Sequence, residues 1–219
     1  MRLHNELEQG SPEWLALRAG KITASRAKDA RDVLKSGKPT AKQTAYAAQV
    51  AVERIAGYPI ERNFETWQMR EGTALEPACR AAYEAETGNV VQEVGAIESD
   101  DGLFLYSPDG LVGDDGLIEI KSLFSAERIV SILADGDITD FVDQCMFGLW
   151  LTGRRWIDLC IWCPALASIG LGLRVYHIER DAGAIDALDA DMRKFAQTVL
   201  DYEQRLTYAA TVNLVGAEA

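Results

Sequence analysis

A short acidic segment constrains the fold of this chain more than any other part of the sequence. It runs from Ser107 to Lys121 and reads Ser-Pro-Asp-Gly-Leu-Val-Gly-Asp-Asp-Gly-Leu-Ile-Glu-Ile-Lys. The Gly-Asp-Asp-Gly stretch at 113–116 predicts a tight turn between a first strand and a second strand over 117–123. Because side chains alternate along a strand, Ile118 and Ile120 are predicted to point into the core, opposite to their charged neighbours.

Three charged side chains of this hairpin form a candidate metal site. Glu119 and Lys121 are two positions apart and share a face, and the hairpin can bring Asp109 close to Glu119. Two carboxylates suit Mg²⁺, which takes one or two carboxylates and completes its shell with water and phosphate oxygens. The alternative is a hairpin with an exposed turn and a surface Glu–Lys pair.

Length and composition indicate one globular domain over residues 1–219. The chain is 48% hydrophobic, and no apolar run approaches the roughly 20 residues that a membrane span needs. The N-terminus has no apolar signal region, so we expect a cytoplasmic protein without membrane contact. In that compartment the four cysteines, Cys79, Cys145, Cys160 and Cys163, are expected to be reduced thiols.

The charge is unevenly distributed along the chain. The net charge is −12, which on its own argues against a nucleic-acid partner. Residues 18–42, however, hold eight basic residues against two acidic ones, so this segment is +6 and the remainder is −18. Such segregation favours phosphate contacts on one surface, as in a DNA channel, although a solvated helix face with a basic loop has the same composition.

The N-terminal region has clear helix signals. Ser11 is a candidate N-cap, Pro12 fits the first helical position, and Gly20 is expected to end the helix. A second helix is predicted to begin near Thr23, and Trp14 is predicted to pack in the core.

Hydrophobic periodicity predicts an alternation of helices and strands in the rest of the chain. Helices are expected over 40–57, 65–87, 125–134, 140–151 and 181–208, and strands over 90–98, 103–106, 155–163 and 171–178. The predicted fold class is α/β, with a mixed central sheet and helices on both faces.

The hairpin motif resembles that of a known nuclease superfamily. The pattern Ser-Pro-Asp109 followed by Glu119-Ile-Lys121 is similar to the PD-(D/E)xK motif of metal-dependent nucleases. The resemblance implies that Asp109, Glu119 and the carbonyl of Ile120 bind metal. It implies that Lys121 activates or orients the attacking water.

The N-terminal pattern is more specific. Trp14-x3-Arg18-x-Gly-x-Ile-Thr-Ala-Ser25 closely resembles the N-terminal motif of the lambda-type phage exonucleases, also called viral recombinase nucleases. This family implies that Arg18, Ser25 and Ser107 surround the 5′-phosphate of a DNA end.

Two further blocks extend the resemblance over nearly the whole chain. Glu76 matches the helical glutamate that faces the metal site in this family, although Pro77 biases it away from helical geometry, so the helix either begins or kinks there. Gln144 matches the glutamine-bearing helix behind the active site. The wider nuclease group often has a tyrosine four residues later, where this chain has Gly148.

The resemblance implies a Mg²⁺-dependent 5′-to-3′ exonuclease that acts on double-stranded DNA ends and leaves 3′ overhangs for annealing-type recombination. It implies catalytic roles for Asp109, Glu119, Lys121, Glu76 and Gln144. Two Mg²⁺ ions per site are expected, with Mn²⁺ as a substitute. It also implies a homotrimeric ring, a single-strand annealing protein as partner, and a phage or prophage origin within a bacterial cell.

Three alternatives remain open. Cys160-Ile-Trp-Cys163 has the spacing of a thioredoxin-like redox motif, but it ends a predicted strand late in the chain. An iron–sulfur nuclease of the same superfamily has one cysteine upstream and three downstream of its acidic core, as here. The third alternative is a DNA-end-binding module, which would bind DNA in a groove but would not hydrolyse it.

Overall fold

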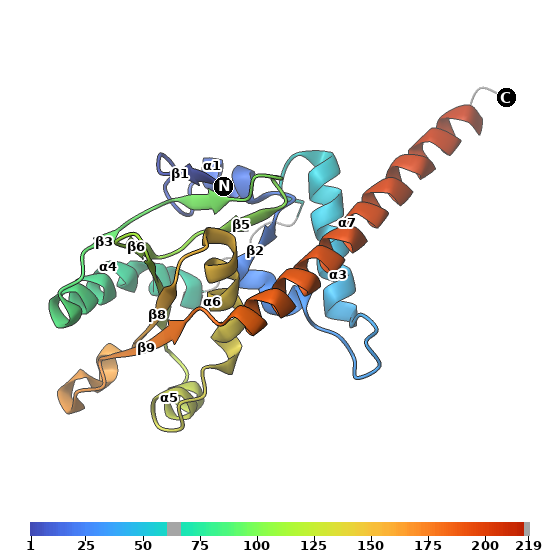
Figure 1. Cartoon of the computed structure of the whole chain (residues 1–219). Helices are drawn as coiled ribbons and strands as arrows, with labels where there is room; N and C mark the ends of the chain where they lie inside the picture. Colours follow the sequence, from blue (N-terminus) through green and yellow to red (C-terminus); the bar gives the residue numbers. More distant parts are fainter. Residues whose placement is uncertain (61–66, 217–219) are drawn as a thin grey trace.

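The computed structural model describes residues 1–60 and 67–216. Its centre is a five-stranded mixed sheet in the order β3-β6-β7-β8-β9 (Figure 1). The strands are β3 (Val91–Gln92), β6 (Gly110–Val112), β7 (Gly116–Ser122), β8 (Trp156–Trp162) and β9 (Leu173–Glu179). The pair β7–β8 is parallel, and the other three pairs are antiparallel.

The predicted hairpin is confirmed as β6 and β7. Gly110 pairs with Ile118 and Val112 with Gly116, so the chain reverses over residues 113–115. Gly116 is required at its position, because a Cβ atom there would lie 2.2 Å from the indole ring of Trp156. This close approach packs β7 against the parallel strand β8.

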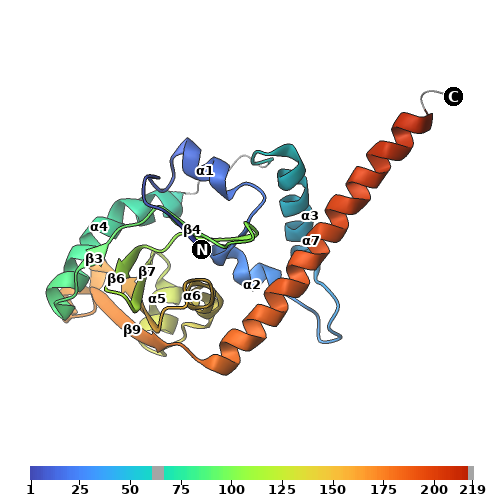
Figure 2. The same cartoon turned by 45° about the horizontal axis from the view of Figure 1, so that its top comes forward.

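Helices cover both faces of the five-stranded sheet, as predicted. Helix α4 (Trp67–Thr87) packs on one face and α6 (Thr139–Thr152) on the other, and Figure 2 shows the strands between them. Ile118 and Ile120 face α4 in a small apolar cluster. The intervening residue, Glu119, therefore points toward α6.

A second, four-stranded mixed sheet has the order β1-β4-β5-β2, and its separation from the first sheet was not anticipated. Its strands have only two or three residues each: β1 (Arg2–His4), β4 (Ala96–Glu98), β5 (Phe104–Tyr106) and β2 (Ile22–Thr23). Strand β2 runs parallel to β5, with Ile22 opposite Phe104. This pairing brings the N-terminal motif beside the Ser-Pro-Asp segment that follows β5.

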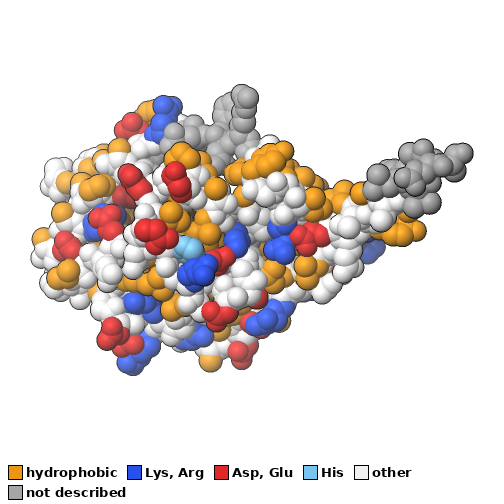
Figure 3. Space-filling view, turned by 90° about the horizontal axis from the view of Figure 1, so that it is seen from above, with side chains coloured by type: hydrophobic (Ala, Val, Ile, Leu, Met, Phe, Trp, Pro, Cys, Tyr) orange, Lys and Arg blue, Asp and Glu red, His pale blue; other side chains and the backbone are white. Residues whose placement is uncertain are grey.

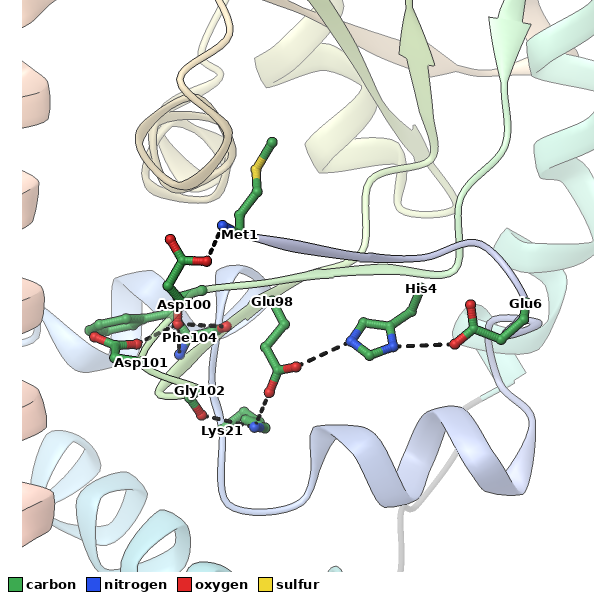
Figure 4. Close-up of polar contacts among 10 residues, drawn as sticks. Met1, His4, Glu6, Lys21, Glu98, Asp100, Asp101, Gly102 and Phe104 are labelled. Carbon is green, nitrogen blue, oxygen red and sulfur yellow. Dashed lines mark hydrogen bonds and ion pairs between the residues drawn. The ribbon is translucent and has the colours of Figure 1, made fainter.

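A buried polar network fixes one end of this second sheet (Figure 4). The Lys21 ammonium donates to Glu98 and to the carbonyl oxygen of Gly102, the latter at 2.8 Å. The His4 ring lies 3.2 Å from the other Glu98 oxygen. Because Glu98 is only 9% exposed, these partners offset the cost of burying its charge.

The N-terminal helix forms as predicted. It is α1 (Pro12–Arg18), and the Ser11 hydroxyl accepts from the backbone N–H of Trp14. The second helix, predicted to begin near Thr23, is short: Thr23 is followed by a 3₁₀ turn, η1 (Ala24–Arg26), and by the four-residue α2 (Ala27–Ala30).

The remaining predicted helices also form, as α3 (Ala41–Ala56), α5 (Ala126–Leu133) and α7 (Ala182–Gly216). The single strand predicted over 90–98 is instead two strands in different sheets, β3 and β4, and the 3₁₀ helix η2 (Pro164–Ile169) was not predicted. Residues 65 and 66 of the helix predicted over 65–87 lie outside the described residues. Helix α7 packs against α3 and α6 and then projects beyond the body of the molecule (Figure 1). Within the described ranges, no helix is both long and apolar enough to cross a membrane.

Candidate active site

Glu119 is the most constrained side chain of the candidate site. It is 2% exposed, and three donors reach its carboxylate. Oε1 accepts from the Lys121 ammonium at 2.8 Å and from the Gln144 side-chain amide, while Oε2 accepts from the Tyr106 hydroxyl at 3.0 Å. The structure therefore brings together Glu119, Lys121 and Gln144 from β7 and α6, as the sequence predicted. Tyr106, on β5, was not predicted.

Asp109 lies at the start of the hairpin and faces the same site. Its Oδ2 accepts from the backbone N–H of Ile120 at 2.5 Å, which locks the carboxylate onto the neighbouring strand. Burial raises the pKa of Asp109 well above its usual range, and the negative charge of Glu119 adds to this effect. Lys121 and the Ile120 N–H act in the opposite direction without reversing the shift.

Glu76 joins these groups from helix α4. It lines a cavity of about 310 Å³ together with Asp109 and Arg80. Burial raises the pKa of Glu76; Arg80 and Lys121 oppose this shift, and Glu119 reinforces it. The helix does not begin at Pro77, since α4 runs through it from Trp67. The alternative in which the helix begins at Pro77 was therefore wrong.

The surroundings of Lys121 keep its side chain charged. Burial alone would lower the pKa of Lys121, but the negative charges of Glu119 and Asp109 outweigh that effect and raise it. The side chain is 27% exposed, so the ammonium lies at the rim of the site while Glu119 lies beneath it. A charged donor at this position can orient a water molecule or offset charge on a phosphate.

The donor set of this site fits a hard divalent cation. Asp109, Glu119 and Glu76 offer only oxygen atoms, and their mutual repulsion would be relieved by a positive ion between them. In the described part of the chain, no three His, Cys, Asp or Glu side chains are grouped tightly enough to hold an ion alone. Mg²⁺ does not need such a cage, because it keeps water and phosphate oxygens in its shell.

The predicted phosphate-binding residues lie on the adjacent N-terminal layer. An Arg18 guanidinium nitrogen is 3.4 Å from the Ser25 hydroxyl oxygen, and the guanidinium carbon lies 4.3 Å from the centroid of the Trp14 ring. Burial lowers the pKa of Arg18, and no described carboxylate forms an ion pair with it. A partly buried arginine without a carboxylate partner can accept an anionic ligand.

Trp14 was predicted to pack in the core. It is instead half-buried and connects two parts of the site. Its indole N–H donates to the Ser107 hydroxyl at 2.9 Å and to the Gly95 carbonyl at 3.1 Å. The same ring stacks on Arg18, so Arg18 and Ser107 are held on one side of the molecule by one side chain.

Most of the basic segment is neutralised within the chain. Five of its eight cations form ion pairs with carboxylates: Lys21, Arg26, Lys28, Arg31 and Lys42. Figure 3 shows acidic and basic side chains interspersed on one face of the molecule. Arg18 is therefore distinguished from these five by its lack of an ion pair among the described residues.

The four cysteines are free and buried, and they do not share one site. Cys79 and Cys160 belong to the cluster beneath α4, whereas Cys145 lies on α6 in the core on the opposite face of the sheet. Because they lie on opposite faces of the sheet, the four cysteines cannot bind one iron–sulfur cluster together. Cys160 and Cys163 do not form a disulfide bond.

Comparison with known proteins agrees with this geometry. Residues 13–155 match the YqaJ-like viral recombinase domain. The structure is similar to an alkaline exonuclease (LHK-Exo) from Laribacter hongkongensis, with 33% identity, a TM-score of 0.79, and coverage of 92% of this chain and 100% of that one. The same exonuclease in complex with dAMP gives a TM-score of 0.80 with the same identity and coverage.

A phage-related exonuclease from Haemophilus somnus 129PT shares the fold, with 15% identity, a TM-score of 0.59, and coverage of 87% of this chain and 96% of that one. Curated protein sequences gave no match. The fold and the site define a chain of the lambda exonuclease-like class. The chain belongs to the YqaJ-like viral recombinase family.

Proposed function

We propose that this protein is a Mg²⁺-dependent exonuclease that digests one strand of double-stranded DNA from its 5′ end. The observation that carries the proposal is the convergence of Asp109, Glu119 and Glu76 beside the charged Lys121. The similarity to an exonuclease with 33% identity over 92% of the chain supports the same reaction class. That relative's complex with dAMP is consistent with a nucleotide product.

Asp109, Glu119 and the Ile120 carbonyl would hold the first Mg²⁺, and Glu76 would hold a second ion or its water. Bound Mg²⁺ supplies a Lewis acid that stabilises the attacking and leaving oxygens of an in-line displacement. Lys121 would orient the attacking water and offset the charge that develops on the phosphate oxygens. Gln144 keeps Glu119 in place from α6.

The bond that breaks in this proposal is between phosphorus and the 3′ oxygen of the terminal nucleotide. Water supplies the oxygen added to phosphorus, and the leaving 3′ oxygen takes a proton. The shortened strand therefore keeps a 5′-phosphate, which Arg18, Ser25 and Ser107 would bind for the next cycle. The complementary strand is left as a 3′ overhang, the substrate that annealing-type recombination with a partner annealing protein requires.

A homotrimeric ring is proposed from the family resemblance. An acidic ring around DNA can remain associated through many cycles without binding tightly, because dissociation is prevented by its closed shape. This property reconciles the net charge of −12 with a DNA substrate.

The test is Mg²⁺-dependent release of nucleotides from linear duplex DNA by wild-type protein and by Asp109→Ala and Glu119→Ala. We expect both substitutions to abolish hydrolysis while DNA-end binding stays close to wild type. Mn²⁺ should replace Mg²⁺, and chelation with EDTA should stop the wild-type reaction. Full activity in either variant would refute the assignment of the site, and retained end binding without wild-type hydrolysis would favour a binding module.

A further inference from the structure

The carboxylate of Glu119 is nearly saturated by the protein itself. A carboxylate has about four lone-pair sites, two on each oxygen. Oε1 accepts from Lys121 and Gln144, and this fills both of its sites. Among the described residues, Oε2 accepts from the Tyr106 hydroxyl alone, at 3.0 Å, and therefore retains a single open lone pair.

Tyr106 reaches Glu119 from the second sheet, and its side chain is fully buried. It is 1% exposed, and its ring lies against the backbone of α6 at Gly148. A Cβ atom at position 148 would lie 2.7 Å from Cε1, 2.8 Å from Cζ and 3.0 Å from the hydroxyl oxygen of Tyr106. Any larger residue at 148 would displace the end of the ring that carries the hydroxyl.

Gly148 is unfavourable for the helix itself. Glycine inside a helix costs about 0.5–1 kcal/mol relative to alanine. Its φ lies outside the left-handed region, so the backbone conformation does not require glycine. The close approach of Tyr106 is the structural reason for glycine at this position.

We propose that Tyr106 and Gly148 act together as a positioning pair that fixes the one open lone pair of Glu119 for the divalent cation. This inference rests on the proposed function and extends it. Tyr106 does not touch the substrate in this account. It acts through Glu119, by holding Oε2 so that the carboxylate cannot rotate while Lys121 and Gln144 hold Oε1.

The conservative variant is Tyr106→Phe, which keeps the ring and removes only the hydroxyl. Loss of a group that orients a metal ligand typically lowers metal affinity or activity about 10- to 100-fold. We therefore expect at least about a 10-fold rise in the Mn²⁺ dissociation constant, measured by electron paramagnetic resonance on the protein without DNA, because Mn²⁺ is expected to support digestion of a DNA end. The Mg²⁺ concentration for half-maximal hydrolysis should rise in parallel, while DNA-end binding in EDTA should not change.

The chain provides a matched control in Tyr83→Phe. Tyr83 is also fully buried, and its hydroxyl donates to a buried carboxylate, Asp158, at 2.6 Å. Asp158 is outside the candidate active site, on β8. Tyr83→Phe should lower thermal stability by an amount similar to Tyr106→Phe and leave Mn²⁺ affinity unchanged, so it separates a positioning role from ordinary core stability.

Gly148→Ala provides a second, independent variant. It retains the Tyr106 hydroxyl but pushes the ring, so it should weaken Mn²⁺ binding in the same direction. Tyr106→Phe and Gly148→Ala both disturb the contact between Tyr106 and Glu119. Their effects on the Mn²⁺ dissociation constant should therefore be less than multiplicative in the double variant. If Tyr106→Phe or Gly148→Ala folds and binds Mn²⁺ as tightly as the wild type does, the inference is wrong. If the wild type binds no Mn²⁺ and hydrolyses no DNA, the proposed function itself fails.

Discussion

The indole N–H of Trp14 donates to the hydroxyl of Ser107 at 2.9 Å, although the two residues lie 93 positions apart in the sequence. This bond connects helix α1 to the segment that enters the β6–β7 hairpin. The Trp14 ring also stacks on Arg18, so one side chain orders both halves of the proposed 5′-phosphate pocket.

The bond between Trp14 and Ser107 can be removed by one substitution. Trp14→Phe retains an aromatic ring for Arg18 but loses the donor to Ser107. Because one hydrogen bond contributes about 0.5–1.5 kcal/mol, we expect the preference for 5′-phosphorylated ends to fall about 2- to 10-fold. Digestion rates of 5′-phosphorylated and 5′-hydroxyl duplexes, compared at saturating Mg²⁺, measure this ratio. An unchanged ratio would make Trp14 a packing residue only.

Lys121→Ala tests the proposed water-orienting group. We expect turnover to fall at least about 100-fold, the usual scale for an electrostatic or acid–base group at the reacting centre. Single-turnover hydrolysis of a short duplex should show the loss directly, since it separates chemistry from binding. A small loss that appears only as weaker DNA affinity would show that Lys121 contacts phosphate without assisting the chemical step.

A pH-dependent contribution to stability is expected from His177 on β9, two strands away from β7 of the hairpin. Its Nδ1 lies 2.6 Å from a buried Asp158 oxygen, and this hydrogen bond raises the pKa of His177 above the usual 6.5 despite partial burial. A raised folded-state pKa stabilises the protein below the unfolded-state pKa, and the effect disappears as pH rises through the folded-state value.

The thermal midpoint of the wild type should therefore exceed that of His177→Gln by on the order of 2 °C at pH 5.5. The difference should shrink at pH 9. Differential scanning calorimetry at the two pH values gives both midpoints. A difference that grows with pH would contradict the assigned direction of the pKa shift.

The ring hypothesis predicts a defined mass in solution. One chain is 24.1 kDa, and light scattering at working concentration should give three times that value. A monomer mass would refute the trimer, whatever the activity.

The sequence predicted the hairpin because its signals are local. Turn glycines and strand alternation brought Asp109, Glu119 and Lys121 together, whereas the place of Gln144 behind them came from the family resemblance. The local bias of Pro77 favoured a helix start there, but α4 runs through this residue. Thr73 and Pro77 both lie on the exposed side of α4, where water can replace the hydrogen bond that the proline ring removes.

Contacts between residues far apart in the chain could not be predicted from the sequence. Tyr106 contacts Glu119 because β5 of one sheet and β7 of the other both pack against α6. The charge of residues 18–42 likewise indicated a basic surface, yet Arg31 pairs with Asp143 and Asp191, more than 100 positions away. Composition records how many charges a segment has but does not identify their partners.

The most direct test of the account is the digestion of linear duplexes that differ only in their 5′ ends. In Mg²⁺, wild-type protein should release mononucleotides from the 5′ end, leave a 3′ overhang, and act faster on 5′-phosphate than on 5′-hydroxyl ends. Arg18→Ala should lose most of that preference and shorten the processive run while it still binds metal. Digestion from the 3′ end, or equal rates on both 5′ ends by the wild type, would contradict the account.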